Sequence, residues 1–275
     1  MLIDILQDIV AEKKQLGISE AVIKNFLKEY LQYPALDFIY NSSEYKNFIF
    51  TGGSCLRVCF NAPRLSEDLD FDLQEDEWKK FDLKIFGEKI TAMFRNKYLL
   101  PVESRTQSDY RVYLKFSVLK KMGLAKKMDS DFLLIKIEPN QSRYNIEAIE
   151  KTSVAKFGFN FVGRNYKLSY MMVGKIGALF NRLWFKGDKN EIDIKGRDFY
   201  DLYWYLQNKI EPNWEVMRQL VGIANREELK DKILDLIDKK VTVQKLSYDL
   251  KNFFPEQIFV EEFCKNYKEL ISKLL

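Results

Sequence analysis

The chain contains no histidine among its 275 residues. This absence excludes a histidine-based zinc site, a Ser-His-Asp triad and a histidine general base. Any catalysis must therefore use carboxylates, lysine, tyrosine or a bound metal ion. Carboxylate and metal chemistry is the main route that the composition leaves open.

Cysteine and long apolar runs are scarce as well. Cys55, Cys59 and Cys264 form an odd set without a CxxC pair, so a reducing compartment is expected and a disulfide framework is not. No run approaches the roughly 18 apolar residues that a membrane-spanning helix needs. Acids at positions 4 and 8 replace the basic region of a signal peptide. We expect a soluble, cytoplasmic protein with no membrane partner.

The overall charge is nearly balanced. There are 44 basic and 40 acidic residues, which give a net charge of +4, and 47% of the residues are hydrophobic. That apolar fraction is ample for a packed core. The weak positive excess argues against a dedicated non-specific nucleic-acid binder, but it does not exclude an RNA partner.

A strand is expected over residues 66–73, where acids alternate with apolar residues. Because strand side chains alternate between faces, Asp68, Asp70 and Asp72 should point the same way. Three carboxylates on one face repel each other unless a cation lies between them, and Mg²⁺ takes carboxylate and phosphate oxygens as ligands. The alternative is a charged edge strand of the kind that resists aggregation.

A glycine turn precedes the acids. Residues 47–51 predict a short buried strand that ends at Gly52 and Gly53, and Ser54 follows at the start of a helical segment. Free N–H groups at a helix N-terminus bind anions. The alternative is an ordinary strand-to-helix turn that needs small residues. Together with the acids, the turn predicts a phosphate-binding site beside a metal site.

The remaining pattern is mixed α and β up to about residue 165 and mostly helical from residue 169 onward. Expected helices cover residues 2–16, 19–40, 75–98, 169–184 (with Ser169 as N-cap) and 197–206, and expected strands cover 110–119 and 131–138. Glu138 ends the last strand, just before Pro139. We predict two domains, residues 1–165 and 166–275.

Three segments carry motif-like patterns and occur in a fixed order. They are the glycine turn followed by Arg64-Leu-Ser66-Glu-Asp68-Leu-Asp70, then Lys175-Ile-Gly-Ala-Leu-Phe-Asn-Arg182, then Gly196-Arg197-Asp198-Phe-Tyr-Asp201-Leu. Together they resemble the motifs of the AbiEii/AbiGii-type toxin nucleotidyltransferases, a branch of the DNA polymerase beta-like nucleotidyltransferase superfamily. The similarity spans roughly residues 45 to 206, and the C-terminal third carries no matching motif.

The resemblance implies an α+β fold: a nucleotidyltransferase core with a small mixed β-sheet flanked by helices, followed by a helical C-terminal region. It also implies that Asp68 and Asp70 bind Mg²⁺ or Mn²⁺. A third acid is expected from a neighbouring strand. Glu138 is the first choice as this metal ligand and catalytic residue, and Asp72 is the fallback.

The resemblance further assigns nucleotide binding and catalysis. Nucleotide-binding residues are expected to be Gly52, Gly53, Ser54, Ser66, Lys175 and Arg182. Lys175 and Asp198 join the acids as catalytic residues. Lys175 lies in an apolar sequence context, where an unpaired ammonium is costly, so it needs an anion as a partner. Salt bridges from Asp198 and Asp201 that pin two helices together are the structural alternative.

The resemblance implies a nucleotidyltransferase toxin of a type IV-like, abortive-infection toxin–antitoxin pair. Such an enzyme takes an NTP, releases pyrophosphate and transfers the nucleotide to an acceptor such as tRNA, and a separate cognate antitoxin is its expected partner. A small-molecule nucleotidyltransferase of the antibiotic-modifying type and a non-catalytic nucleotide-binding regulatory module are the alternatives.

Two further segments suit RNA contact by charge and stacking. One is the lysine-rich stretch 120–127, and the other is the group of aromatic residues at 200–205. A solvated loop and a helix core, respectively, are the simpler explanations.

Overall fold

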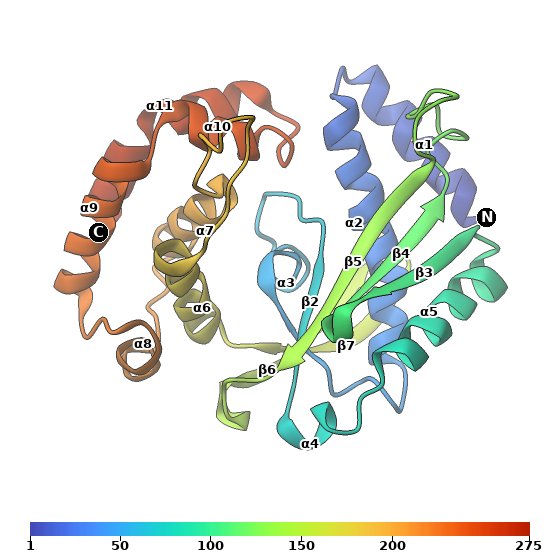
Figure 1. The fold of residues 1–275 in the computed structure, drawn as a ribbon, viewed down its shortest axis with the longest axis horizontal. Helices are drawn as coiled ribbons and strands as arrows, with labels where there is room; N and C mark the ends of the chain where they lie inside the picture. Colours follow the sequence, from blue (N-terminus) through green and yellow to red (C-terminus); the bar gives the residue numbers. More distant parts are fainter. The chain divides into compact units, whose positions relative to one another are not determined.

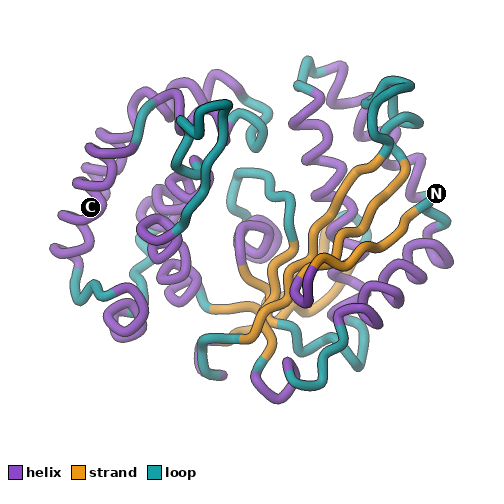
Figure 2. The backbone as a smooth tube through the Cα atoms, viewed as in Figure 1, coloured by secondary structure: helices purple, strands orange, loops and turns teal.

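The computed structural model describes residues 1–275, apart from the side chain of Asp109. The chain forms two compact units, Met1–Tyr166 and Lys167–Leu275. The division lies beside the change of sequence pattern near residue 165. The first unit is mixed α and β, and the second is helical (Figure 2).

The first unit is built on one seven-stranded mixed sheet with the strand order β3-β4-β5-β2-β1-β7-β6 (Figure 1). Its strands are β1 Ile49–Thr51, β2 Leu69–Leu73, β3 Val102–Gln107, β4 Arg111–Ser117, β5 Phe132–Gln141, β6 Ile149–Lys156 and β7 Phe159–Tyr166. The pairs β2–β5 and β1–β7 are parallel, and the other neighbours are antiparallel.

The helices of this unit are α1 Leu2–Gln15, α2 Glu20–Tyr40, α3 Gly52–Phe60, α4 Glu75–Trp78 and α5 Leu83–Tyr98. One sheet face packs on α2 and α5, which also contact each other. Phe71 of β2 meets Phe48, and Phe48 in turn meets Phe86 of α5, with ring centroids 5.5 Å and 5.6 Å apart. This apolar layer is the core of the unit.

The opposite face of the sheet is polar. On β5, Leu133, Ile135 and Ile137 are buried, whereas Lys136 and Glu138 alternate with them and are only partly buried. The same alternation occurs in β2, where Leu69, Phe71 and Leu73 are buried between the acids. Strands with one packed face and one polar face show this two-residue pattern. The acids and Lys136 therefore share the face that α2 and α5 do not cover.

The second unit consists of six helices: α6 Leu168–Asn181, α7 Gly196–Gln207, α8 Trp214–Val221, α9 Arg226–Lys240, α10 Val243–Leu250 and α11 Gln257–Leu274. Helix α7 packs against α6, α10 and α11. Tyr200 of α7 contacts Phe254 and Phe263, with ring centroids 4.8 Å and 5.3 Å apart. These aromatic residues form the core of the unit.

The expected fold class is confirmed: an α+β unit with a mixed sheet flanked by helices, followed by a helical region. The strand that carries the acids begins at Leu69 and not at residue 66. The helix expected over 75–98 is broken in two, because Asp82 accepts hydrogen bonds from the N–H groups of Lys84 and Ile85 and so caps a new helix. Helix α6 begins after Lys167, so Ser169 is not its N-cap.

Strand β5 was expected to end at Glu138, but it continues through Pro139 to Gln141. Its pairing with β4 runs only as far as Ile137, whereas its pairing with β2 continues to Gln141. Proline is tolerated in a strand where its missing N–H faces no partner. Glu138 is thus an internal residue of a strand, at the point where one neighbour has already ended.

No helix in the described chain combines the length and the apolar character that crossing a membrane requires.

The close contact between α7 and α10 gives a stability prediction. A Cβ built on Gly196 would lie 2.6 Å from the carbonyl oxygen of Leu246, so Gly196→Ala must push the two helices apart. We expect it to lower the free energy of unfolding by about 1–3 kcal/mol. Gly177→Ala in α6 is the matched control, since the nearest atom there is the Val221 Cγ2 at 3.6 Å. Urea denaturation of both variants measures the difference. Equal stability of the two would contradict the prediction.

Candidate active site

The predicted acids come together where β2 and β5 run side by side. Asp70 of β2 is the direct register partner of Glu138 of β5 in a parallel pair, and Thr51 of β1 is its partner on the other side. Directly paired residues on one sheet face have Cβ atoms roughly 5 Å apart. The sheet thus brings together two carboxylates that are 68 residues apart in the sequence.

A lysine lies between two of these acids. The Lys136 Nζ is 2.9 Å from the Asp68 Oδ2 and 2.5 Å from the Glu138 Oε2. One ammonium therefore bridges the two carboxylates and offsets one of their two negative charges. Because Lys136 and Glu138 are two residues apart on β5, they point to the same face.

Glu138 has a second cation. The Arg111 Nε, at the start of β4, donates a short hydrogen bond to the Glu138 Oε1. Burial by itself would raise the pKa of Glu138, but the hydrogen bonds and charges of Lys136 and Arg111 outweigh burial and hold this pKa below its ordinary value. Glu138 is therefore a fixed anion at neutral pH.

The glycine turn allows the acids and a buried arginine to approach the start of α3. Gly52 has φ +74°, and a Cβ there would overlap the Asp70 carboxylate. A Cβ on Gly53 would lie 2.5 Å from the Arg64 guanidinium and 2.8 Å from the Ser66 Oγ. Both glycines are thus required by close contacts, and Gly52 also by its positive φ.

The two serines at this turn are both buried. The Ser54 hydroxyl donates to the carbonyl of Asp68, and so ties the start of α3 to the loop before β2. The carbonyl of Ser66 accepts a hydrogen bond from the Gln32 Nε2 at 3.1 Å. In this structure Ser54 positions the acid loop, and its contact with phosphate stays a prediction.

Asp72 shares a strand and a face with Asp70 but has a different environment. The Tyr166 hydroxyl donates a 2.9 Å hydrogen bond to the Asp72 Oδ2. Burial raises the pKa of Asp72 to about 6, although the Tyr166 hydrogen bond and the charge of Arg143 act in the opposite direction. A carboxylate held by a tyrosine and partly protonated near pH 6 is a poorer metal ligand than its neighbours.

The chemistry of the remaining donors fits a divalent cation. Asp68, Asp70 and Glu138 offer carboxylate oxygens only, which suit Mg²⁺ or Mn²⁺. Lys136 already brings a positive charge between two of them. Among the described residues, however, no three His, Cys, Asp or Glu side chains are grouped closely enough to hold a metal ion. The three acids as a metal site stay a prediction.

The second unit holds the other predicted residues in one ion-pair network. The Lys175 Nζ of α6 is 2.6 Å from the Asp201 Oδ2 and 3.5 Å from the Asp198 Oδ1, both on α7. The Arg182 Nη1 makes a short contact with the Asp198 Oδ2. Asp198 and Asp201 are buried. These pairs join α6 to α7, as the structural alternative proposed, and a catalytic role for Lys175, Arg182 and Asp198 stays a prediction.

Lys195, directly before α7, adds a further cation to this network. Burial lowers its pKa to about 8, with the charges of Arg197, Arg182 and Lys175 acting in the same direction and that of Asp198 opposing them. The α7 end of the second unit is thus rich in positive charge.

Sequence reasoning missed Lys136, Arg111 and Arg64 as parts of the site. A signal for Lys136 existed, because strand periodicity puts it on the same face as Glu138. Arg64 stood within the first motif, but its burial against Gly53 depends on the fold. Arg111 reaches Glu138 through strand pairing, which the sequence does not reveal.

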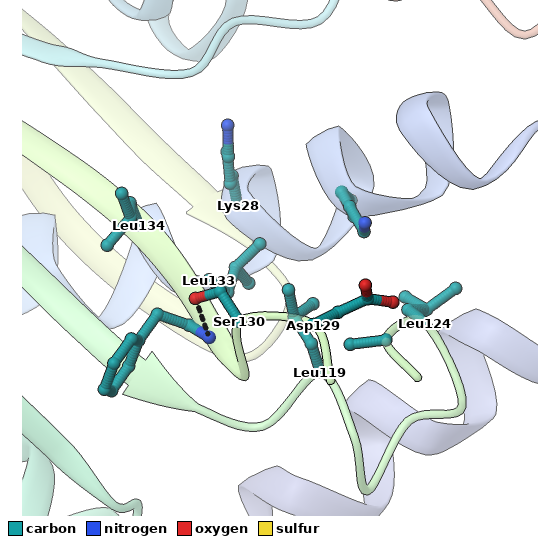
Figure 3. A pocket seen from close by; sticks show the side chains of 10 residues that line it. Lys28, Leu119, Leu124, Asp129, Ser130, Leu133 and Leu134 are labelled. Carbon is teal, nitrogen blue, oxygen red and sulfur yellow. Dashed lines mark hydrogen bonds between the residues drawn. The ribbon is translucent and has the colours of Figure 1, made fainter. Parts of the chain in front are cut away.

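The two segments considered for RNA contact differ in exposure. Lys120, Lys121, Lys126 and Lys127 are exposed, whereas the side chains of Tyr200, Trp204 and Tyr205 belong to the buried core of the second unit. For these three aromatics the helix-core alternative holds. Beside the lysine-rich segment, a pocket with a cavity volume of about 390 Å³ lies between α2 and the start of β5 (Figure 3). Lys28, Asp129 and several leucines line this pocket, and Lys28 also pairs with Glu67 at 2.7 Å.

The environment of Asp72 predicts a pH-dependent stability. Its pKa is about 6 in the folded chain and roughly 3.9 when unfolded, so ionisation of Asp72 destabilises the folded chain. This destabilisation is absent below about pH 4 and complete above about pH 6. Asp72→Asn removes this cost and keeps an acceptor for Tyr166. We expect the variant to be more stable than the parent by about 2 kcal/mol at pH 7.5 and equal to it at pH 4. Urea unfolding at both pH values is the measurement. If Asp72→Asn were more stable than the parent by the same amount at pH 4 and at pH 7.5, ionisation of Asp72 would not be the cause.

The Lys175 network predicts a second stability effect. Lys175→Met withdraws the ammonium from two buried carboxylates, and we expect a loss of about 3–5 kcal/mol in unfolding free energy. Adding Asp201→Asn should restore part of that loss, because one of the two charges is then removed. Tryptophan fluorescence during urea unfolding follows the change. Unaltered stability of Lys175→Met would show that the ion pairs do not hold α6 and α7 together.

Comparison with known structures finds two similar bacterial proteins. The crystal structure of JHP933 from Helicobacter pylori matches with a TM-score of 0.51 and 16% sequence identity, covering 91% of each chain. A candidate nucleotidyltransferase from H. pylori gives a TM-score of 0.48 at 16% identity, covering 90% of this chain and 93% of the other. No curated protein matches the chain. The family described as nucleotidyl transferase AbiEii toxin, type IV toxin–antitoxin system, matches residues 35–275. The chain therefore belongs to the AbiEii family of nucleotidyltransferase toxins.

Proposed function

We propose that this nucleotidyltransferase is metal-dependent and transfers a nucleotide from an NTP to an acceptor such as tRNA, as the toxin of a cytoplasmic toxin–antitoxin pair. The observation that carries the proposal is the direct pairing of Asp70 with Glu138 beside the glycine turn at the start of α3. Family membership supports the reaction type and a cognate antitoxin.

In nucleotidyl transfer, a hydroxyl of the acceptor attacks the α-phosphate of the NTP and pyrophosphate leaves. The protein contributes mainly position and electrostatic stabilisation. Asp68 and Asp70, with Glu138 as third acid, would hold Mg²⁺ or Mn²⁺. When bound, the metal ion stabilises the charge that develops on the phosphate oxygens.

The glycine turn supplies the groups for the triphosphate. The first N–H groups of a helix have no partner within it and bind anions, and those of α3 begin at Gly52 and Gly53. The buried Arg64 guanidinium beside Gly53 adds positive charge there. The Ser66 hydroxyl also lies beside Gly53, and it is a candidate hydrogen-bond donor to a phosphate oxygen.

Glu138 would act on the attacking hydroxyl. Because its two cations hold its pKa low, Glu138 is a weak base. Its contribution would be to orient the hydroxyl and to accept the proton late in the reaction.

In the second unit, Lys175, Arg182 and Asp198 are proposed to serve the same reaction, on the strength of the family motifs. The ammonium and guanidinium suit phosphate oxygens. Asp198, which pairs with both cations, would keep them oriented.

Asp70→Asn tests the proposal. We expect label transfer from radioactive NTP to total tRNA to fall at least about 100-fold, because the charge that holds the metal is lost while the side chain keeps its size. Glu138→Gln should also be strongly impaired. Glu103→Gln, an exposed glutamate of β3, is the control and should retain activity.

The acceptor is tested in the same assay by offering tRNA, protein and small-molecule acceptors with each NTP and Mg²⁺. Label on a small molecule alone would support an antibiotic-type transferase. The absence of any label, with Asp68→Ala as toxic on expression as the parent, would overturn the proposal. Full activity of Glu138→Gln with loss in Asp72→Asn would move the third acid to Asp72.

A further inference from the structure

A cation that belongs to the protein lies inside the acid cluster. The Lys136 ammonium contacts Asp68 at 2.9 Å and Glu138 at 2.5 Å, and its side chain is 22% exposed.

The charge balance explains why a cation is held there. Asp68, Asp70 and Glu138 carry three negative charges on one polar sheet face, and like charges on neighbouring strands destabilise a sheet. Lys136 and Arg111 bring two positive charges to the same face. Removing Lys136 would leave carboxylates repelling each other beside a packed core.

We propose that Lys136 is the internal counter-ion of the acid cluster, which holds Asp68 and Glu138 in place until a divalent cation displaces its ammonium. The inference rests on the metal dependence proposed above and adds a residue that sets how tightly the metal binds. Lys136 is a positioning residue, because it acts through the two carboxylates.

Lys136 and Arg111 differ in their ability to leave. Lysine carries a compact charge on a flexible four-carbon stem, whereas the arginine guanidinium is planar and rigid. Lys136 is partly exposed, so its ammonium has a way out to solvent. Arg111 contacts Glu138 through its Nε and can keep this contact when a metal arrives.

The grouping of the acids agrees with this role. With Lys136 in its observed position, no three acidic side chains of the described residues form a metal-binding group. The contacts of Lys136 occupy one oxygen of Asp68 and one of Glu138, which a divalent cation would also use. The ammonium and the metal ion compete for the same oxygens.

The test is Mn²⁺ binding to the full chain without nucleotide, measured by titration calorimetry and by thermal shift. Lys136→Met removes the competing charge and keeps the length of the side chain. We expect its dissociation constant for Mn²⁺ to be at least about tenfold lower than that of the parent. We also expect the metal-free variant to melt at a lower temperature and to gain more from Mn²⁺.

Lys115→Met is the matched control. Lys115 lies on the same sheet face in β4, pairs with Glu103 at 2.5 Å and is 25% exposed, but contacts none of the three acids. Its replacement should leave Mn²⁺ binding unchanged. A Lys136→Met variant that binds Mn²⁺ no more tightly than the parent or the control would overturn the proposal.

Lys136→Arg keeps the test decisive where Lys136→Met does not fold. Its rigid guanidinium should hold both carboxylates and weaken Mn²⁺ binding, and tighter binding by this variant contradicts the proposal. Asp70→Asn separates the two hypotheses. If the parent binds no Mn²⁺, or if Asp70→Asn binds Mn²⁺ as tightly as the parent, the proposed metal dependence fails. If Asp70→Asn abolishes Mn²⁺ binding but the Lys136 variants bind Mn²⁺ like the parent, only the role of Lys136 fails.

Discussion

The packing of like charges at one level of the sheet is the constraint on which the first unit depends. Parallel pairing of β2 and β5 puts Asp70 next to Glu138, and Asp68 precedes them on the same side. Such a group is stable only if positive charge is supplied. Lys136 and Arg111 supply this positive charge from neighbouring positions. The Asp70 carboxylate lies so close to the backbone of residue 52 that only glycine fits there. The fold thus brings like charges together and compensates them with cationic side chains from neighbouring strand positions.

The second unit uses the same principle with a different geometry. Asp198 and Asp201 are buried on α7, and Lys175 and Arg182 reach them from α6. Breaking such a pair costs more than forming it gains, because a buried charge is left behind. Substitutions here therefore change the stability of the helices together with any chemistry. Activity lost on mutation of these residues has meaning only beside an unfolding measurement.

The sequence predicted what depends on local periodicity. The shared face of Asp68 and Asp70, the glycine turn and most helices followed from spacings of two and of three to four residues. The predictions that failed depend on partners distant in the sequence or on local capping. Asp82 divides the helix expected over 75–98. Strand β3 was not foreseen, because its residues Val102–Gln107 are mostly polar and gain strand structure from β4. Arg111, the second cation of Glu138, depends on the pairing of β4 with β5, whereas Lys136 shares a strand face with Glu138 by local periodicity.

Pro139 has a consequence for contacts between molecules. Beyond Ile137, strand β5 is no longer paired with β4, although the turn Ser108–Tyr110 still contacts it, so residues 138–141 have one edge without a ladder partner. Such edges invite pairing with a strand from another chain. A proline in the middle of this short edge withholds the donor that an added strand would need. Pro139, directly after Glu138, therefore makes the addition of another strand along this edge less favourable.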